Sequence, residues 1–372
     1  MKIIYLANST IPSHEANSVH VMKMCQAFAK NGHNTTLITR KRKKEDSGVN
    51  VFEHYGVEPI FNIKEITRRI IPKIGGLLYY AKYSLSLPKF NRKNVLIYGR
   101  HLRGLYFASR EGLPCVLEVH VPPKDERDRW YQEKIMTSSS FRRMVVITKA
   151  LKDEYLKLFP ILKEEDILVA PDAADVPVGV EKKSIANISK NKRLQIGYVG
   201  SLYWGKGVEI ILKLADEISD VDFQIVGGRK EDVDFWIKKN KNKNVFFHGF
   251  VPHGKLSEYY NSFDIVLAPF QRKVFLSDNE SDIGKWTSPL KMFEYMAAAK
   301  PIIASDLNVL REVLIPERNA LLASPENVDE WASCLVRLKN DPMLRKRLGN
   351  EALKNFLSNY TWKARAVKII EE

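Results

Sequence analysis

The chain has 372 residues, 45% of them hydrophobic and 28% charged, which is long enough for two globular domains. Its 19 glycines and 17 prolines are ordinary numbers and exclude a collagen-like or largely disordered chain. No apolar run approaches the roughly 18 residues that a spanning helix needs, and the first residues lack the pattern of a secretory signal. We therefore expect a cytoplasmic protein without a transmembrane segment.

The charge is unevenly distributed. Residues 1–150 carry 26 Lys and Arg against 12 Asp and Glu, a net +14 that is nearly all of the chain's +15. This asymmetry indicates a polyanionic partner, either nucleic acid or an anionic membrane, with solubility as the alternative. The cysteines are odd in number, widely spaced and set among apolar neighbours: Cys25, Cys115 and Cys334. We expect them to be core thiols and not disulfides or metal ligands.

Short β-branched runs alternate with helical patterns along the whole chain, which predicts βαβ units and parallel sheets. In the first half, strands are expected at 3–7, 35–39, 95–98, 115–119 and 144–148. In the second half, they are expected at 194–199, 223–226, 245–248, 265–268 and 301–305. The segment 181–193 is rich in Lys, Ser and Asn and is predicted to be a linker. The fold class is therefore α/β, with doubly wound domains at 1–180 and 194–362.

The first strand is followed by a turn, residues 8–18, that contains no glycine. The dinucleotide-binding fingerprint needs glycines there, for a tight turn and for close approach to a pyrophosphate. An NAD- or FAD-dependent enzyme is therefore not expected.

A glycine-rich turn instead follows the first strand of the second half, at Gly200-Ser201-Leu202-Tyr203-Trp204-Gly205-Lys206-Gly207. Its spacing matches a P-loop, but Gly207 stands where an NTPase needs a Ser or Thr for magnesium, so we reject that function. A glycine-lined turn into a helix N-terminus, with Lys206 beside it, still fits phosphate binding. The alternative is a structural turn with an incidental lysine.

A second helix start lies in the segment 285–297. Ser288 is predicted to be the N-cap and Pro289 the first helical residue. Ligands of open parallel sheets bind beyond the carboxyl ends of the strands, where we expect this helix to begin. Glu294 falls in its second turn among apolar residues, as either a ligand contact or a solvated glutamate.

Taken together, these stretches resemble the retaining GT-B glycosyltransferases of family 4, also described as glycosyl transferases group 1. The matching segments are 197–207 (GYVGSLYWGKG), 223–228 (FQIVGG), 245–251 (VFFHGFV), 264–269 (DIVLAP), 288–306 (SPLKMFEYMAAAKPIIASD) and 360–362 (YTW). The likeness covers almost the whole chain. It is weaker in the first half, where it rests on 18–32 and on Glu118-Val119-His120.

The resemblance implies two Rossmann-like domains facing a central cleft, with helix 363–372 packing back on the first. It assigns Lys206 to the donor diphosphate, Glu294 to the ribose and His120 to the donor sugar. The donor-binding residues that it implies are Gly200, Ser201, Gly205, Lys206, Gly228, Arg229, Gly249, Phe250, Val251, Ser288, Leu290, Lys291 and Glu294. On the acceptor side they are His14, Asn17, Ser18 and Arg100.

The chain departs from the family pattern at two donor positions. Ser201 stands where the family usually has a basic residue, and Trp286 where it has the first of two glutamates. Candidates to replace the basic residue are Arg229 and Lys285. Candidates to replace the glutamate are Asp278, Glu280 and Asp282.

The function implied is metal-independent, retaining transfer of a sugar from a UDP- or GDP-hexose to a glycan or lipid-linked acceptor, in cell-surface polysaccharide biosynthesis. No cofactor is expected, because the nucleotide sugar is a substrate, and the chain has no Asp-x-Asp motif for a metal. A GT-B sugar-nucleotide epimerase and a catalytically silent partner subunit stay open as alternatives. A nucleic-acid binder is rejected because no recognition motif is present.

The basic residues of the first half cluster at 40–44, 68–69 and 89–93, around the apolar segment 70–87. Proline and glycines interrupt that segment, so it cannot span a bilayer. Apolar anchors flanked by lysines and arginines favour docking on anionic headgroups, at the inner face of the membrane. The alternative is that part of this segment is a buried helix.

Overall fold

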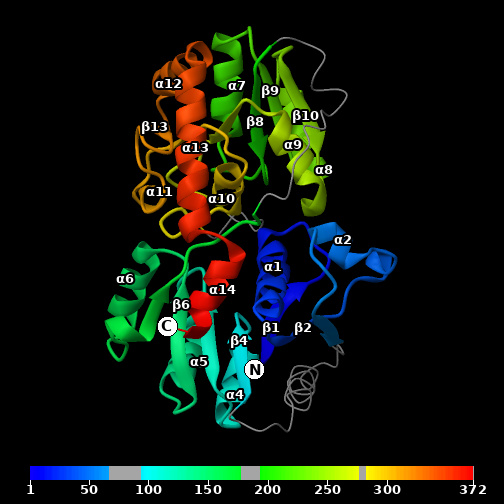
Figure 1. Ribbon diagram of the computed structural model, residues 1–372, viewed down its shortest axis with the longest axis vertical. Helices are drawn as coiled ribbons and strands as arrows, with labels where there is room; N and C mark the ends of the chain where they lie inside the picture. Colours follow the sequence, from blue (N-terminus) through cyan, green and yellow to red (C-terminus); the bar gives the residue numbers. More distant parts are fainter. Residues whose placement is uncertain (67–93, 177–192, 276–281, 372) are drawn as a thin grey trace. The chain divides into compact units, whose positions relative to one another are not determined.

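The computed structural model describes residues 1–66, 94–176, 193–275 and 282–371 (Figure 1). The chain divides into two compact units. The first comprises Met1–Pro171 and Trp362–Glu372, and the second comprises Asp172–Thr361. The predicted linker lies outside the described residues except for its last position. The apolar segment 70–87 and the basic residues at 68–69 and 89–93 also lie outside them.

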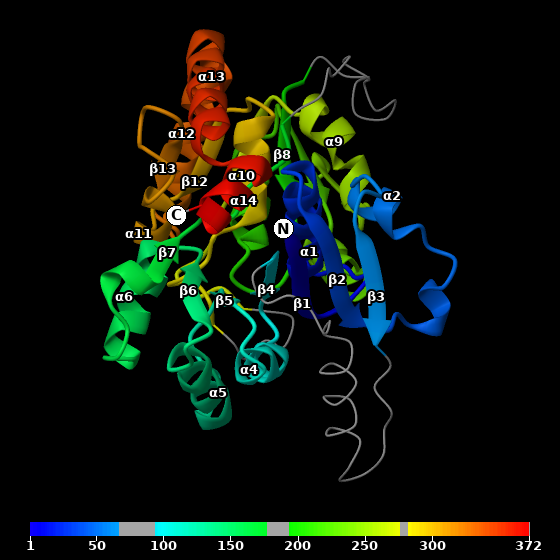
Figure 2. The ribbon, with the colours of Figure 1, turned by 60° about the horizontal axis from the view of Figure 1, so that its bottom comes forward.

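The first unit contains a seven-stranded parallel sheet in the order β3-β2-β1-β4-β5-β6-β7 (Figure 2). Its strands are β1 (Lys2–Thr10), β2 (Asn34–Arg40), β3 (Asn62–Ile66), β4 (Val95–Gly99), β5 (Cys115–Val119), β6 (Phe141–Val146) and β7 (Ile167–Val169). The central strands are nearly continuous buried runs, as expected for a sheet that is covered on both faces. All five strands predicted for this half are present.

The α-helices of the first unit are α1 (Ala16–Lys30), α2 (Val51–Tyr55), α4 (Leu102–Arg110), α5 (Glu126–Met136), α6 (Lys149–Leu158) and α14 (Trp362–Glu371). Among its described residues, short 3₁₀ turns lie at η1 (Lys44–Asp46) and η3 (Glu164–Asp166). The C-terminal helix α14 packs against α1, and α4 packs against α5. Cys25 and Cys115 are buried free thiols, and burial raises the pKa of Cys115 to about 12. These thiols are inert core residues.

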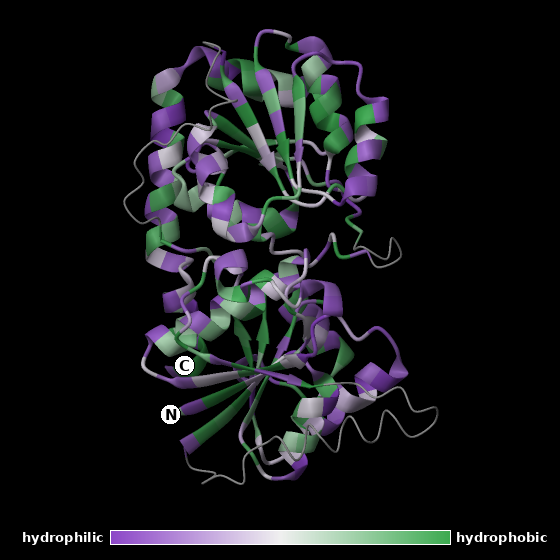
Figure 3. Cartoon of the chain, turned by 90° about the vertical axis from the view of Figure 1, so that its right-hand side faces the viewer, coloured by the Kyte–Doolittle hydropathy of each residue, from purple (hydrophilic) through white to green (hydrophobic). Residues whose placement is uncertain are grey.

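The second unit contains a six-stranded parallel sheet in the order β10-β9-β8-β11-β12-β13. Its strands are β8 (Gln195–Val199), β9 (Asp222–Val226), β10 (Val245–Gly249), β11 (Ile265–Ala268), β12 (Ile302–Ser305) and β13 (Leu321–Ala323). Its helices are α7 (Val208–Glu217), α8 (Lys230–Lys239), η4 (His253–Lys255), α9 (Leu256–Ser262), α10 (Leu290–Ala297), α11 (Asn308–Arg311), α12 (Val328–Asn340) and α13 (Pro342–Asn359). Separate hydrophobic cores form, one containing α10 residues and the other α7 and α12 residues. Figure 3 colours the chain by hydropathy, and hydrophobic residues, drawn in green, make up much of the strands. The sheet is therefore doubly wound.

The division between the units falls at Pro171, earlier than the expected boundary at residue 180. Hydrogen bonds explain this difference. The Asp172 amide donates to Ser288 Oγ at 3.0 Å, and the Ala174 amide donates to the Tyr360 carbonyl at 3.1 Å. These contacts attach the start of the connection to the second unit. Among the described residues, no helix combines the length and the apolar character needed to cross a membrane.

Candidate active site

The carboxyl ends of three neighbouring strands of the second unit meet at glycines. Gly200 follows β8, Gly227 and Gly228 follow β9, and β10 ends at Gly249. The Gly227 amide donates to the Gly249 carbonyl at 2.7 Å. A Cβ on Gly227 would lie 2.3 Å from the Gly200 carbonyl oxygen, so only glycine allows this approach. The structure thus brings together Gly200, Gly228 and Gly249, which the resemblance assigns to donor binding.

The turn after β8 has a packing role as well. Gly205 and Gly207 have φ values of 83° and 82°, in the left-handed region. A Cβ would lie 2.0 Å from the Lys273 carbonyl oxygen at Gly205, and 1.8 Å from the Pro269 carbonyl oxygen at Gly207. Backbone packing alone therefore accounts for these two glycines. They also place the first amides of α7 at the carboxyl edge of the sheet, where an anion would be stabilised.

A buried lysine without a hydrogen bond lies beside this turn. The Nζ of Lys291, in α10, is 3.6 Å from the Tyr198 ring centroid and 5.1 Å from that of Phe270. It has no hydrogen-bond partner among the described residues, and a Cβ on Gly200 would lie 2.7 Å from it. Lys206 Nζ lies 5.3 Å from the same Phe270 ring. Burial, and then the charge of Lys206, holds the pKa of Lys291 well below its ordinary value.

Lys291 is better placed than Arg229 or Lys285 to compensate for Ser201. Its ammonium lies against Gly200, the residue directly before Ser201. Arg229, one of the expected substitutes, instead binds Asp232 through two nitrogens at 2.9 and 3.1 Å. Lys285, the other, is exposed. The sequence pattern places Lys291 in the donor site but gives no sign that it replaces the missing basic residue.

Glu294 is held in one orientation by two donors. His253 Nε2, in η4, lies 2.6 Å from Oε1, and the Tyr260 hydroxyl, in α9, donates to Oε2 at 2.6 Å. Burial raises the pKa of Tyr260 and the Glu294 charge raises it further, so the phenol stays protonated and donates. A carboxylate oxygen can accept more than one hydrogen bond, so a ribose hydroxyl is a chemically suitable additional donor. The sequence analysis missed His253 and Tyr260 because no spacing signal links them to Glu294.

The start of α10 differs from the prediction. Ser288 was predicted to be the N-cap, and this is wrong by one residue: Pro289 is the N-cap, and Leu290 is the first helical residue. Pro289 has φ −73° and ψ 125°, an extended conformation that delays the helix. The Ser288 hydroxyl accepts the amide of Asp172 and therefore does not cap the helix.

The other donor-side candidates are in varied environments. Phe250 is 37% exposed, whereas Val251 packs against the core beneath α10. Asp282 accepts two backbone amides of its own loop, each at 2.9 Å, which gives it a structural role. Asp278 and Glu280 lie outside the described residues. The replacement for the missing glutamate at position 286 is therefore unassigned.

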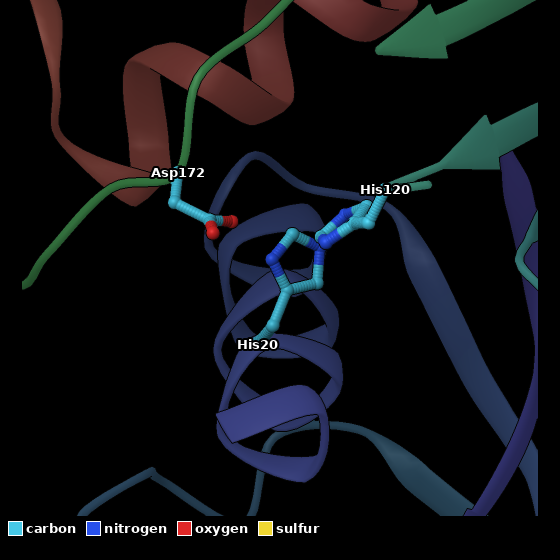
Figure 4. Close-up of side chains that lie close together, drawn as sticks. All are labelled: His20, His120 and Asp172. Atoms are coloured by element: carbon cyan, nitrogen blue, oxygen red, sulfur yellow. The ribbon is translucent and has the colours of Figure 1, made fainter. Parts of the chain in front are cut away.

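In the first unit, His120 directly follows β5 (Figure 4). Its Nε2 lies 2.8 Å from Glu118 Oε1, and its ring is 4.9 Å from that of His20 in an edge-on arrangement. Because an ionised carboxylate only accepts hydrogen bonds, Nε2 of His120 carries a proton. Glu118 thus fixes both the tautomer and the orientation of the ring.

The Glu118 carboxylate is fully buried and gathers donors from several elements. Arg365 of α14 donates to Oε1 at 2.6 Å, and the Tyr98 hydroxyl of β4 donates to Oε2. His20 Nε2, in α1, lies 3.0 Å from Oε1. Burial alone would raise the pKa of Glu118, but Arg365, His20 and the hydrogen bond from His120 hold it well below its ordinary value. One ionised carboxylate therefore connects His120 to the C-terminal helix.

Two of the four acceptor-side candidates lie together. Asn17 Oδ1 accepts from Arg100 at 2.5 Å, and Asn17 Nδ2 donates to Ser9 Oγ at 2.8 Å. Ser18 is buried, and its hydroxyl donates to a backbone carbonyl three residues earlier at 2.7 Å, which indicates a role in packing. His14 is exposed.

Comparisons with known proteins agree with this architecture. Residues 193–341 match the family model of glycosyl transferases group 1. An uncharacterized glycosyltransferase of Methanocaldococcus jannaschii is 21% identical, over 93% of this chain and 90% of its own. Sucrose-phosphate synthase from Thermosynechococcus elongatus superposes with a TM-score of 0.73 at 18% identity, over 98% of this chain and 96% of that one. The Anabaena protein HepE in complex with UDP gives 0.75 at 15% identity, over 100% and 99%.

The parallel sheets of the two units and these structural similarities define a GT-B fold. The expected resemblance to the group 1 glycosyltransferases is confirmed by the family match. The chain is a glycosyltransferase of the GT-B type.

Replacing Glu294 with glutamine should weaken binding of a free nucleoside and of its diphosphate by similar factors, because the expected contact is to ribose. One charge-assisted hydrogen bond corresponds to about 10- to 150-fold in affinity. Calorimetric titration of uridine, UDP, guanosine and GDP measures this. A loss confined to the diphosphates would contradict the ribose assignment.

Proposed function

We propose that this glycosyltransferase retains anomeric configuration, needs no metal, and transfers a hexose from UDP- or GDP-sugar to a glycan or lipid-linked acceptor in cell-surface polysaccharide biosynthesis. The observation that carries the donor class is Lys291, a buried ammonium without a hydrogen-bond partner in the described chain, beside Lys206 and Gly200. Burying a cation without a hydrogen-bond partner is costly. A bound diphosphate would remove that cost.

Residues at the carboxyl edge of the second sheet would bind the donor and stabilise its leaving group. As the bond from sugar to phosphate breaks, negative charge develops on the leaving nucleoside diphosphate. Lys206, Lys291 and the N-terminus of α7 would stabilise that charge, and Glu294 would hold the ribose. HepE, a structural relative, is in complex with UDP, which supports a nucleoside diphosphate as the ligand class.

The first unit would supply the acceptor site and His120. The acceptor hydroxyl would attack the anomeric carbon from the face that the diphosphate leaves. Its proton would pass to a phosphate oxygen of the leaving group, so no dedicated base is needed. His120, whose Nε2–H is directed at Glu118, would orient the donor sugar and not act as nucleophile.

Incubating the purified chain with radiolabelled UDP-glucose or GDP-mannose, with and without a glycan acceptor and with EDTA, tests this function. We expect nucleoside diphosphate release that persists in EDTA, and a product with the anomeric configuration of the donor. An isomerised sugar nucleotide formed without acceptor would indicate an epimerase. Absence of turnover despite nucleotide binding would indicate a silent partner subunit. A strict requirement for Mg²⁺ or Mn²⁺ would contradict the mechanism.

The expected association with an anionic membrane gains little support from the described residues. In the basic cluster 40–44, Arg42 binds Glu65 at 2.6 Å and Lys43 binds Glu45 at 3.2 Å. These pairs neutralise part of the cluster. The other basic clusters and the apolar segment between them lie outside the described residues.

A further inference from the structure

Two arginines at the carboxyl edge of the first sheet are held by amides. Arg40 is the last residue of β2, and Arg100 directly follows β4. Arg40 Nε donates to Asn8 Oδ1 at 2.8 Å, and Arg100 donates to Asn17 Oδ1 at 2.5 Å. Within the described ranges, neither guanidinium has a carboxylate at ion-pair distance.

Arg42 differs from Arg40 and Arg100 because its partner is a carboxylate. Arg42 binds the Glu65 carboxylate at 2.6 Å and so forms a neutral pair. An amide oxygen orients a guanidinium without neutralising it, and each guanidinium has five N–H donors. Arg40 and Arg100, both only partly buried, therefore keep their full charge and have donors to spare for an anion.

Arg100 is fixed at the point where the strand order of the sheet reverses, between β1 and β4. A Cβ on Gly99 would lie 2.3 Å from the Leu6 carbonyl oxygen, and the Arg100 amide donates to that same oxygen at 3.2 Å. Asn17 belongs to the first turn of α1, whose N-terminus adds positive potential. In open parallel sheets, ligands bind at this kind of switch point, beyond the carboxyl ends of the strands.

The neighbouring histidine adds no positive charge to this edge of the sheet. His101, which follows Arg100, accepts the Gly104 amide through Nδ1 at 3.1 Å. Burial, and then the charges of Arg40 and Arg103, lower the pKa of His101 to about 4. The histidine is therefore neutral at neutral pH, and the positive charge of this edge resides on the arginines.

We propose that the acceptor is anionic: a sugar or glycan bearing a phosphate or carboxylate group that binds Arg40 and Arg100. The proposal rests on the proposed function, in which the first unit holds the acceptor. Guanidinium groups match both anions because they can donate two parallel hydrogen bonds. The diphosphate of the donor is assigned to Lys206 and Lys291 of the second unit, so it does not account for these arginines.

The test measures binding of glucose 6-phosphate, glucuronate and neutral glucose to the full chain by calorimetry, alongside UDP and GDP. We expect the wild type to bind at least one of the anionic sugars at millimolar concentration and to bind glucose more weakly. Arg40→Gln and Arg100→Gln should each weaken the anionic sugar about tenfold or more while leaving nucleotide affinity unchanged. Arg142→Gln is the matched control, since Arg142 lies near the amino end of β6, at the opposite edge of the same sheet.

Several outcomes would overturn the proposal. These are an absence of anionic sugar binding in the wild type, and equal losses in the Arg142 control. Sedimentation of the chain with phosphatidylglycerol vesicles, lost in the Arg40 and Arg100 variants while no anionic sugar binds, would assign the arginines to lipid headgroups instead. If the wild type binds neither UDP nor GDP, the proposed function is wrong, but the result for the anionic sugars can still be interpreted.

Discussion

Replacing Arg365 with methionine should lower the free energy of unfolding of the first unit by about 3–5 kcal/mol at neutral pH. The guanidinium is the strongest donor to a carboxylate that has no exposed surface. Methionine fills a similar volume but leaves Glu118 ionised and buried without its cation. The tyrosine and histidine donors remain, but neither His20 nor His120 carries the permanent charge of an arginine.

Lys368→Met is the control for this prediction. Lys368 is also on α14, and its ammonium donates to the Val169 backbone carbonyl at 3.3 Å. Its replacement should change the free energy of unfolding by about 1 kcal/mol or less. Because two units need not unfold together, urea unfolding is combined with peptide-resolved hydrogen exchange. Equal losses for the two variants would show that Arg365 acts only through packing.

The deficit of the Arg365 variant should depend on pH. In the wild type, the folded pKa of Glu118 lies below its unfolded value. Its ionisation therefore stabilises the fold fully above the unfolded pKa, and that contribution is lost as pH falls through the folded pKa. In the variant, the folded pKa of Glu118 rises, so acid removes the penalty of the unpaired charge. The difference between wild type and variant should shrink below about pH 4.

The strands show how far sequence reasoning extends in this protein. All ten predicted strands exist, and several of them, such as β5, β8 and β11, are buried along their whole length. Three strands were not predicted. β3 is an edge strand in which exposed and half-buried residues alternate, and it includes the charged Lys64 and Glu65. β7 and β13 are only three residues long. Segments that are short or exposed on one face have too little hydrophobic pattern to be recognised.

The site divides in the same way. The turn 200–207 and Glu294 were recognisable from the sequence because each belongs to a continuous segment that carries its own pattern. The pairing of Glu118 with Arg365 was not, because 247 positions separate the two residues and only the packing of α14 on α1 brings them together. Likewise, the resemblance places Lys291 in the donor site, but only the structure shows that its Nζ is buried 3.6 Å from the Tyr198 ring centroid and 5.1 Å from that of Phe270.

Replacing Lys291 with methionine should have opposite effects on stability and on nucleotide binding. The free protein should become more stable by about 1 kcal/mol or more, because a buried ammonium without a hydrogen-bond partner in the described chain is exchanged for an apolar side chain. Affinity for UDP or GDP should fall about 10- to 150-fold, the value of a charge-assisted contact. Affinity for uridine or guanosine should not change. A residue that only supports the fold cannot produce this combination.

The pH dependence of binding separates Lys291 from Lys206. Because burial and the charge of Lys206 hold the pKa of Lys291 well below its ordinary value in the free protein, a bound diphosphate should raise that pKa again. Affinity should therefore decline as pH rises from the lowered pKa toward the ordinary one, and calorimetry in buffers of different ionisation enthalpy should detect proton uptake. Both effects should vanish in Lys291→Met and persist in the exposed control Lys285→Met. If Lys291→Met binds UDP and GDP as the wild type does, or loses nucleoside and diphosphate affinity equally, the diphosphate assignment is wrong.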